Sequence, residues 1–355
     1  MRILYYSFEH AKQEYGGNVI LKRNLAYLKK LAGEENVVSY STTNIPPGFT
    51  RILRGLQKLT GFELFADRKL LKELGDFDYV FIDGTARGSF SRRTIRKIKA
   101  ITFFHNVEYD YYCQKNAGAR GLKKLKSYLQ NRTEYYYERR LCKNSEVIIT
   151  LNQRDSDHLK QLYGRGSDLL LPTSMEDAYQ ETDFPQSNDA SKYLLFVGSD
   201  FFGNTEGLFW FCEKCMPYVK MPLIVAGLGM DKYKDRYSSD NIQFYGYVDD
   251  LAGLYRNAAA VVLPIISGSG MKTKTCEAMM QGKVIFGTRE SFEGYQLSED
   301  CILCNDAGEF IEKINAYLDA GARPYSAANR ELFLKNYEKS VVEKKFLDFF
   351  SRIKA

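Results

Sequence analysis

The chain is poor in several residue types, and each shortage excludes a class of protein. Its 355 residues include three histidines, eight prolines and seven cysteines. An odd number of cysteines suits a reducing compartment better than a disulfide framework. No apolar run approaches the roughly 18 residues of a membrane-spanning helix, and the first ten residues lack the basic, apolar and small-residue order of a signal peptide. We therefore expect a cytoplasmic protein.

Metal-binding motifs are also scarce. Two cysteine pairs have the CxxC spacing of a zinc half-site, Cys212 with Cys215 and Cys301 with Cys304, but 85 residues separate the pairs. A zinc ribbon places its pairs about 15 to 20 residues apart. We interpret all four as buried structural cysteines, and we predict no metal site and no resident cofactor.

The sequence does contain a regular alternation of short apolar runs and segments of helical period. The runs lie at 2–8, 37–42, 79–84, 100–106, 147–152 and 169–174, and then at 193–199, 222–228, 242–248, 259–265, 283–288 and 301–306. Near-continuous apolar strands are typical of parallel sheets that helices cover on both faces. The pattern predicts an α/β protein of two doubly wound, Rossmann-like domains that face each other across a cleft.

Polar composition marks the boundary between the two sets of runs. The segment 176–192 has few large apolar residues, so we interpret it as a linker between a domain over 1–175 and a domain over 193–334. The tail 329–355 has a helical period with several phenylalanines. We expect its helix, from about 335 to 355, to pack on the first domain; the alternative is a basic tail that lies on a membrane.

Positive charge is concentrated in the first part of the chain. Residues 1–146 hold 27 Lys and Arg against 15 Asp and Glu, whereas 147–355 hold 23 against 29. In the basic segment 119–132 the apolar residues share one helical face: Leu122, Leu125, Tyr128 and Leu129. Such a helix can bind an anionic membrane surface or an acidic acceptor, or it can cover its own core. No nucleic-acid-binding motif occurs, so no nucleic-acid partner is expected.

The segment from Gly268 to Thr288 is the most informative about chemistry. It follows an apolar strand and begins a helix that we predict over Met271–Met280. Gly268 and Gly270 let backbone N–H groups approach a ligand at the helix N-terminus, where the helix dipole favours an anion.

Three charged residues follow these glycines. Lys272 and Lys274 fall in the first helical turn, where a cation opposes the helix dipole, and a bound phosphate would account for them. Glu277 lies on the same face as Lys274 and could accept hydrogen bonds from ribose hydroxyls. The alternative is an ordinary surface helix with two solvated lysines.

This segment resembles the nucleotide-sugar motif of the family 4 glycosyltransferases, which have the GT-B fold. Other segments resemble further blocks of that family in the same order: 15–18, 103–108, 194–211, 223–229, 244–265 and 288–295. The resemblance is strong over 194–295 and weaker over 1–110. It implies that a sugar is transferred from a nucleotide diphosphate donor with retention of anomeric configuration.

The resemblance also assigns roles to residues. Glu277 matches the second glutamate of the family's E-x7-E pattern, which binds the ribose, and Lys274 matches a lysine at the donor diphosphate. His105 matches a histidine beside the transferred sugar and completes the predicted catalytic group. Glu108 is predicted to bind the acceptor or to cap a helix. The predicted donor-binding residues are Gly16, Gly17, Gly198, Tyr247, Val248, Gly268, Ser269, Gly270, Met271 and Lys272.

The sequence departs from the family pattern at two places. Ser269 stands where the first glutamate of E-x7-E is expected, and residues 200–204 supply no cation where the family often has an arginine. Lys272 and Lys274 must then supply more of the positive charge that contacts the diphosphate. Without an acidic metal triad, we expect lysines and helix amides to stabilise the leaving nucleotide.

These observations predict a glycosyltransferase whose basic N-terminal domain binds a saccharide or lipid-linked acceptor. Such an enzyme would serve surface polysaccharide or glycoconjugate assembly, and it could act as a peripheral protein on the inner membrane face. Two alternatives stay open: a nucleotide-sugar epimerase of GT-B fold, and a non-catalytic nucleotide-sugar-binding partner of another transferase.

Overall fold

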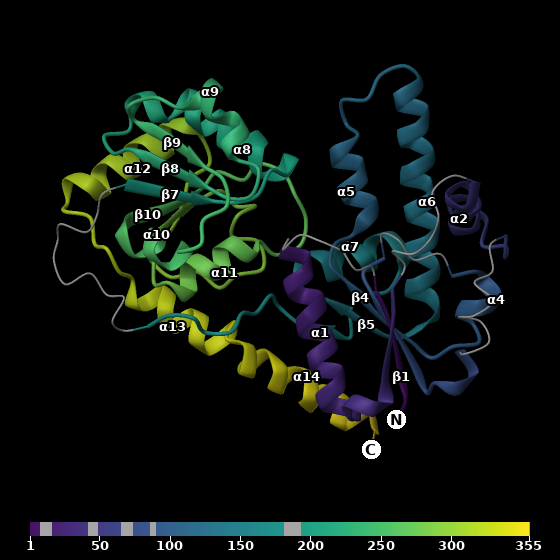
Figure 1. The fold of residues 1–355 in the computed structure, drawn as a ribbon. Coiled ribbons are helices and arrows are strands. Elements are labelled where there is room, and N and C mark those ends of the chain that lie inside the picture. The colour runs from purple at the N-terminus through teal and green to yellow at the C-terminus, as the bar shows by residue number, and fades with distance from the viewer. Residues whose placement is uncertain (8–15, 42–48, 65–73, 86–89, 181–192, 355) are drawn as a thin grey trace. The chain divides into compact units, whose positions relative to one another are not determined.

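The fold was analysed in a computed structural model that describes residues 1–7, 16–41, 49–64, 74–85, 90–180 and 193–354 (Figure 1). The chain forms two compact units. Unit 1 comprises Met1–Pro172 and Glu343–Ala355, and unit 2 comprises Thr173–Val342. Most of the predicted linker, residues 181–192, lies outside the described residues. Among those described, no helix has the length and apolar composition needed to cross a membrane.

Unit 1 is built on a six-stranded parallel sheet in the order β2-β1-β3-β4-β5-β6. Its strands are β1 (Ile3–Ser7), β2 (Val37–Ser41), β3 (Tyr79–Asp83), β4 (Ala100–Phe104), β5 (Ser145–Thr150) and β6 (Leu169–Leu170). Its helices are α1 (Gly16–Ala32), α2 (Phe49–Thr60), α4 (Arg92–Ile95), α5 (Glu108–Lys115), α6 (Leu122–Asn144) and α7 (Gln153–Tyr163). Figure 1 shows α5 and α6 side by side as a hairpin that extends beyond the sheet.

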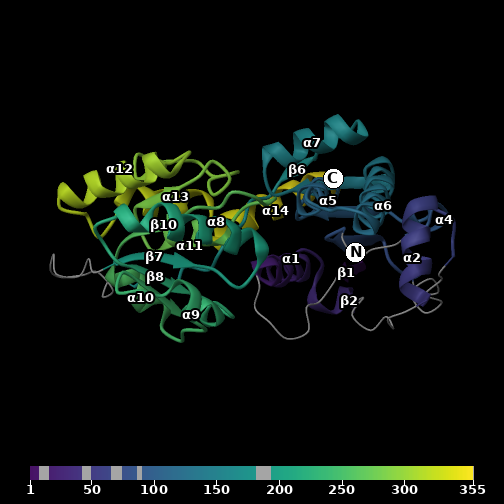
Figure 2. The same ribbon diagram turned by 90° about the horizontal axis from the view of Figure 1, so that it is seen from above.

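Unit 2 is built on a second six-stranded parallel sheet in the order β12-β11-β10-β7-β8-β9. Its strands are β7 (Tyr193–Val197), β8 (Leu223–Ala226), β9 (Ile242–Tyr245), β10 (Ala258–Leu263), β11 (Ile285–Gly287) and β12 (Cys301–Leu303). Its helices are α8 (Phe202–Lys214), α9 (Lys234–Tyr237), α10 (Leu251–Asn257), α11 (Thr273–Met280), α12 (Ala307–Asp319) and α13 (Ala327–Asn336). Figure 2 shows α12 and α13 on one side of the sheet and α9 and α10 on the other. Two doubly wound parallel sheets confirm the predicted fold class.

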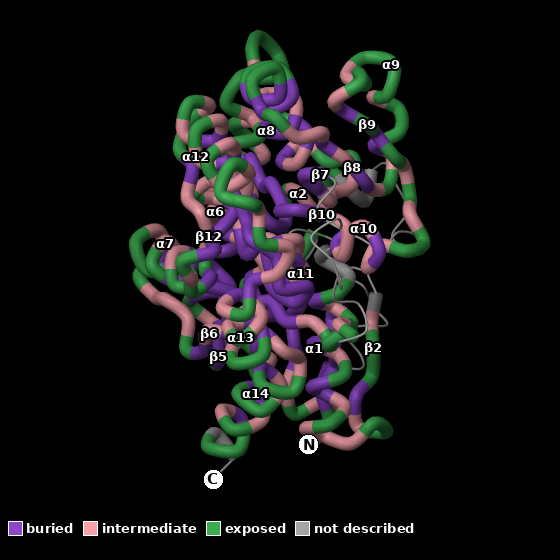
Figure 3. Tube along the Cα trace, turned by 90° about the vertical axis from the view of Figure 1, so that its left-hand side faces the viewer, coloured by how far each residue is buried: buried purple, intermediate pink, exposed green. Residues whose placement is uncertain are grey.

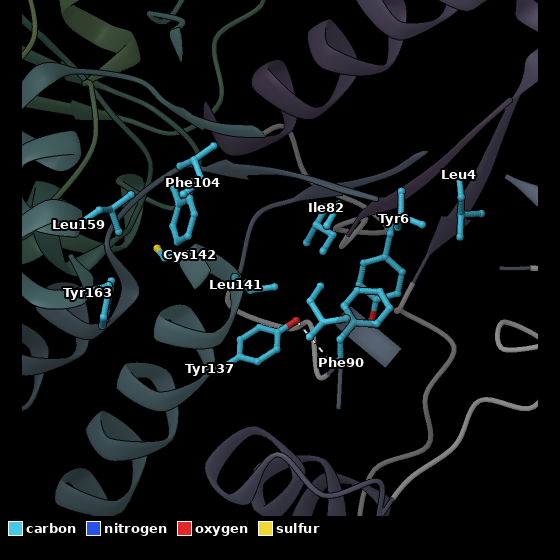
Figure 4. Packing of buried hydrophobic residues seen from close by; sticks show 14 of the residues in the cluster. Leu4, Tyr6, Ile82, Phe90, Phe104, Tyr137, Leu141, Cys142, Leu159 and Tyr163 are labelled. Atoms are coloured by element: carbon cyan, nitrogen blue, oxygen red, sulfur yellow. Dashed lines mark hydrogen bonds between the residues drawn. The ribbon is translucent and has the colours of Figure 1, made fainter. Parts of the chain in front are cut away.

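The strands form the buried centre of each unit. Figure 3 shows buried residues along the strands and exposed residues on the outer helical turns. In unit 1 one face of the sheet packs against α6 and α7, with Phe104 and Ile82 from the strands and Leu141 and Leu159 from the helices (Figure 4). Burial on both sides explains why these strands are near-continuous apolar runs rather than alternating ones.

The C-terminal tail differs from the single helical pattern in the sequence. It forms two helices, α13 and α14 (Lys339–Lys354), and Tyr337 ends α13. Phe333 is buried within unit 2. Phe346 is buried in unit 1, where its ring centroid lies 5.7 Å from that of Tyr27. The buried phenylalanines of the tail therefore pack against protein.

The paired cysteines are structural. Cys212, Cys215, Cys301 and Cys304 are all buried free thiols, as the sequence predicts. Burial raises the pKa of Cys212, Cys215 and Cys304 to about 12, so these thiols stay protonated at neutral pH. Within the described residues there is no group of three or more His, Cys, Asp or Glu side chains suited to a metal ion.

Candidate active site

The loop between β10 and α11 forms the centre of the candidate site in unit 2. The helix begins at Thr273, two residues later than predicted, because Lys272 has extended backbone dihedrals and serves as the N-cap residue. Gly270 adopts a left-handed conformation, with φ of 63°, that L-residues avoid. Among the described residues, the amides of Ser269, Gly270 and Met271 donate to no backbone carbonyl. Together with the N-terminus of α11, they form a potential anion site.

The order of the strands places this loop at a switch point. In unit 2, β7 lies between β8 and β10, so the chain leaves β7 toward one edge of the sheet and returns to β10 on the other side. Open α/β sheets bind ligands where the strand order reverses, beyond the carboxyl ends of the strands. Gly198 directly follows β7 and Gly268 belongs to the loop after β10, so the two predicted donor-binding segments meet there.

Lys274 joins these two segments. Its ammonium group donates a hydrogen bond to Oδ1 of Asn204 in α8 and lies 4.7 Å from the ring centroid of Phe196 in β7. The amide of Asn204 in turn donates to the Ser199 carbonyl at 2.8 Å. Loss of hydration, reinforced by the charge of Lys272, lowers the pKa of Lys274 to about 7, although Glu277 opposes the shift.

Gly198 leaves the space that Lys274 occupies. A Cβ atom at position 198 would lie 2.9 Å from Nζ of Lys274 and 3.0 Å from Nδ2 of Asn204. The glycine is therefore required by a close contact with the site rather than by its backbone conformation.

Glu277 is held by a residue that the sequence analysis missed. The hydroxyl of Tyr255 in α10 donates to Oε2 of Glu277 at 3.0 Å. Burial raises the pKa of Glu277, while Tyr255 and Lys274 act in the opposite direction. The pattern of apolar and polar residues in the seven-residue helix α10 does not indicate that its tyrosine contacts another helix.

Lys272 is not a solvated lysine. Its Nζ contacts Oε1 of Glu290 at 2.6 Å and the carbonyls of Ser269 and Gly270 at 3.3 and 3.2 Å. Its side chain is 12% exposed. Lys272 therefore stabilises the glycine loop through hydrogen bonds to its carbonyls. Glu290 is a second site residue that the sequence analysis missed.

The remaining predicted donor-binding residues of unit 2 lie at the same edge of the sheet. Tyr247 and Val248 follow β9, and the ring of Tyr247 is 74% exposed. The carbonyl of Gly246 accepts a hydrogen bond from the amide of Gly227, which links this segment to the end of β8. Met271 is buried at the start of α11.

Unit 1 carries the other predicted residues. Gly16 and Gly17 are the first residues of α1. His105 directly follows β4, and its Nε2 lies 2.6 Å from Oδ1 of Asp83 at the end of β3. Asp83 was not predicted, although it is a charged residue within the apolar run 79–84.

Glu108 begins α5 and is buried. Burial and the nearby Glu134 raise the pKa of its carboxyl to about 7, opposed by Lys58, Asn106 and His105. The cap of α5 comes instead from Glu138 in α6, whose carboxylate accepts from the amides of Glu108 and Tyr109. The carboxyl of Glu108 does not cap the helix; its Oε1 lies 3.5 Å from Nδ2 of Asn106.

Helix α6 carries an uncovered apolar face at its N-terminal end. Leu122 is 88% exposed and Leu125 is 58% exposed. Tyr128 and Leu129 are also exposed, and Lys123, Lys124 and Lys126 flank them. Among the described residues this stripe does not cover a core, which removes one of the two interpretations of the basic segment.

Comparison with known proteins identifies the domain that carries the first group of residues. Residues 191–320 match the family described as glycosyl transferases group 1. This segment is a glycosyltransferase domain, and the chain is an enzyme of this type. No functionally curated protein matches the chain in sequence.

Solved structures extend the likeness over the whole fold. Anabaena HepE in complex with UDP has 12% identity and a TM-score of 0.67, over 99% of this chain and 100% of that chain. The lipopolysaccharide outer core galactosyltransferase WaaB, in its apo form, has 12% identity and a TM-score of 0.64 over 99% and 100%. A glycosyltransferase from Rickettsia africae has 13% identity and a TM-score of 0.65 over 99% and 98%. At these identities the likeness shows the fold, which is GT-B.

Proposed function

We propose that this glycosyltransferase transfers a sugar, with retention of anomeric configuration, from a nucleotide diphosphate sugar to a saccharide or lipid-linked acceptor. Its role would be in surface polysaccharide or glycoconjugate assembly. UDP-sugars are the first donors to test, since HepE has been crystallised with UDP and with UDP-glucose.

One observation carries the proposal: Lys274, Asn204 and Gly198 meet at the switch point of a sheet whose neighbouring loop ends in a helix N-terminus. A diphosphate there would receive hydrogen bonds from backbone amides and the charge of Lys274. Glu277, fixed by Tyr255, would accept from the ribose hydroxyls.

The same groups account for donor activation. As the glycosidic bond breaks, negative charge grows on the leaving phosphate, and the pre-oriented amides and Lys274 stabilise it without rearrangement. The leaving phosphate would deprotonate the acceptor hydroxyl on the same face of the sugar. Glu108 would hold the acceptor through its carboxyl, and His105 would contact the transferred sugar.

An anionic membrane surface is the proposed partner of unit 1. The exposed face of α6 combines Leu122 and Leu125 with three lysines, so apolar insertion and attraction to anionic headgroups act together. Co-sedimentation with phosphatidylglycerol vesicles should exceed that with phosphatidylcholine vesicles. Leu122→Ser with Leu125→Ser should reduce it, and Leu334→Ser, at an exposed leucine of unit 2, should not. Equal binding to both vesicle types would refute the membrane contact.

Thermal shift against UDP-, GDP-, ADP- and CMP-sugars tests the proposal. A donor at 100 times its Kd should stabilise the protein by about 2.7 kcal/mol. The shift should vanish in Lys274→Ala and persist in Lys214→Ala, a control at an exposed lysine of α8. Absence of any shift would contradict the donor site. Sugar isomerisation without acceptor would favour an epimerase, and unchanged cellular glycan in Glu277→Ala would favour a non-catalytic partner.

A further inference from the structure

A buried hydrogen-bond network in unit 1 converges on Asp83. This residue ends β3 at the position where the strand order of unit 1 reverses, because β1 lies between β2 and β3. Its side chain has no solvent exposure. Oδ2 accepts from the hydroxyl of Tyr5 at 2.6 Å and from Nδ2 of Asn24 at 3.0 Å. Oδ1 lies 3.1 Å from the same Nδ2 and 2.6 Å from Nε2 of His105.

The donors around Asp83 are fixed by their own surroundings. Oδ1 of Asn24 accepts from Nε and Nη2 of Arg23 at 3.1 and 2.9 Å, which turns the NH2 group of the Asn24 amide toward Asp83. Burial, with the neighbouring Asp83 carboxylate, raises the pKa of Tyr5 well above its usual value, so its hydroxyl stays protonated. The groups that face Asp83 from β1 and α1 are therefore a hydroxyl and an amide NH2, both of which can donate to its carboxylate.

This arrangement determines which nitrogen of His105 carries the proton. An ionised carboxylate accepts hydrogen bonds and cannot donate them. The short contact at Nε2 is thus a hydrogen bond donated by the ring, and in the neutral imidazole Nδ1 has the lone pair. The ring is 16% exposed, and within the described part of unit 1 its Nδ1 has no hydrogen-bonding partner.

We propose that Asp83 is a positioning residue that holds His105 in its Nε2–H tautomer, so that Nδ1 accepts a hydrogen bond from a hydroxyl of the donor sugar. The proposal rests on the proposed function, which places His105 beside the transferred sugar. Asn24 belongs to the helix that begins at Gly16, so the network also ties α1 to the histidine.

The tautomer can be measured directly by long-range 15N–1H NMR of the imidazole rings at about pH 8.5, two units above the usual histidine pKa. His158 is an internal control, since its Nδ1, not its Nε2, lies 2.8 Å from Oδ2 of Asp110. In the wild type, His105 should show only the Nε2–H form and His158 the Nδ1–H form. Asp83→Asn should introduce Nδ1–H at His105 alone. A wild-type His105 with Nδ1–H, or with mixed tautomers, overturns the proposal, and this test needs no variant to fold.

Kinetics test the hydroxyl contact. With UDP-glucose, or with the donor that the thermal-shift panel identifies, Asp83→Asn should lower kcat/KM about tenfold, the loss of one hydrogen bond. Among the monodeoxy analogues of that donor, one should show no further loss in Asp83→Asn, because the hydroxyl that binds Nδ1 is already absent. His158→Gln should leave kcat/KM unchanged. An equal loss with every analogue refutes the hydroxyl contact. A protein with the predicted tautomer that uses no nucleotide sugar contradicts the proposed function instead.

Discussion

The hydroxyl of Tyr255 donates a hydrogen bond to Oε2 of Glu277 at 3.0 Å, from a ring that is 1% exposed. The bond links α10 to α11 and orients a carboxylate beside the glycine loop. It also works against burial, which otherwise favours the protonated acid. Tyr255 thus favours the ionised form of Glu277, which can only accept hydrogen bonds.

Removing this hydroxyl should weaken both the fold and the site. Tyr255→Phe leaves the carboxylate without its buried donor, at a cost of about 1–3 kcal/mol of unfolding free energy. It should also raise the pKa of Glu277 further. When the pH is lowered, UDP affinity should therefore begin to fall at a higher pH in the variant than in the wild type. Denaturant unfolding and UDP titration between about pH 5 and 8 measure both effects. Tyr237→Phe is the matched control, since that tyrosine pairs with Glu213 on the surface; an equal effect there would refute the role of Tyr255.

Lys274 should take up a proton when a diphosphate binds. With its pKa lowered to about 7 in the free site, the amine is largely neutral at pH 8, whereas the bound diphosphate favours the ammonium form. Affinity should therefore fall by up to about tenfold per pH unit as pH rises above 7. Calorimetric titration of UDP at pH 8, in buffers of different ionisation enthalpy, should report uptake approaching one proton. No uptake in the wild type would contradict the assignment, and Lys274→Met should abolish it.

Gly198→Ala should affect binding more than stability. The added Cβ meets the flexible end of Lys274, which can move away, but only by leaving the position from which it reaches a phosphate. We expect UDP affinity to fall about tenfold, with a loss of stability below about 1 kcal/mol. Gly55→Ala in α2 has open space around it and should raise stability by up to about 1 kcal/mol through helix propensity without changing affinity. Normal affinity in Gly198→Ala would show that Lys274 does not contact the nucleotide.

Glu108 should reduce stability as pH rises. Its folded pKa of about 7 lies above the ordinary value of 4.5, so the folded state binds more protons and stability falls between these two values. Glu108→Gln should therefore stabilise the protein by about 2–3 kcal/mol at pH 8 and by little at pH 4. The carboxyl of Glu108 also interacts electrostatically with Glu134 and Glu138 of α6 and with Lys58 of α2. Because Lys58 lowers the pKa of Glu108, the variant must retain this lysine.

Activity separates the two roles of Glu108. If its carboxyl binds the acceptor, the stabilised Glu108→Gln variant should have a higher KM for acceptor at unchanged donor affinity. An unchanged acceptor KM would assign Glu108 to structure alone.

The fold was predictable because parallel strands buried on both faces leave a strong signal in the sequence. The ends of the strands were less predictable than the strands themselves. The apolar run 169–174, for example, forms a strand of only two residues, since Pro172 has no N–H group to donate to a sheet. Lys274 and Glu277 could be proposed as site residues from the sequence, because a glycine loop before a helix is typical of an anion-binding site. Tyr255 and Glu290 were not, since their contacts depend on how helices and loops pack. Periodicity identified the apolar stripe of α6, but only the structure shows that no described residue covers it.

A crystal structure of the protein with UDP tests the central claim most directly. The account predicts diphosphate oxygens within hydrogen-bond distance of Nζ of Lys274 and of the amides around Gly270, and ribose hydroxyls on Glu277. A nucleotide bound elsewhere, with the loop between β10 and α11 empty, would contradict it.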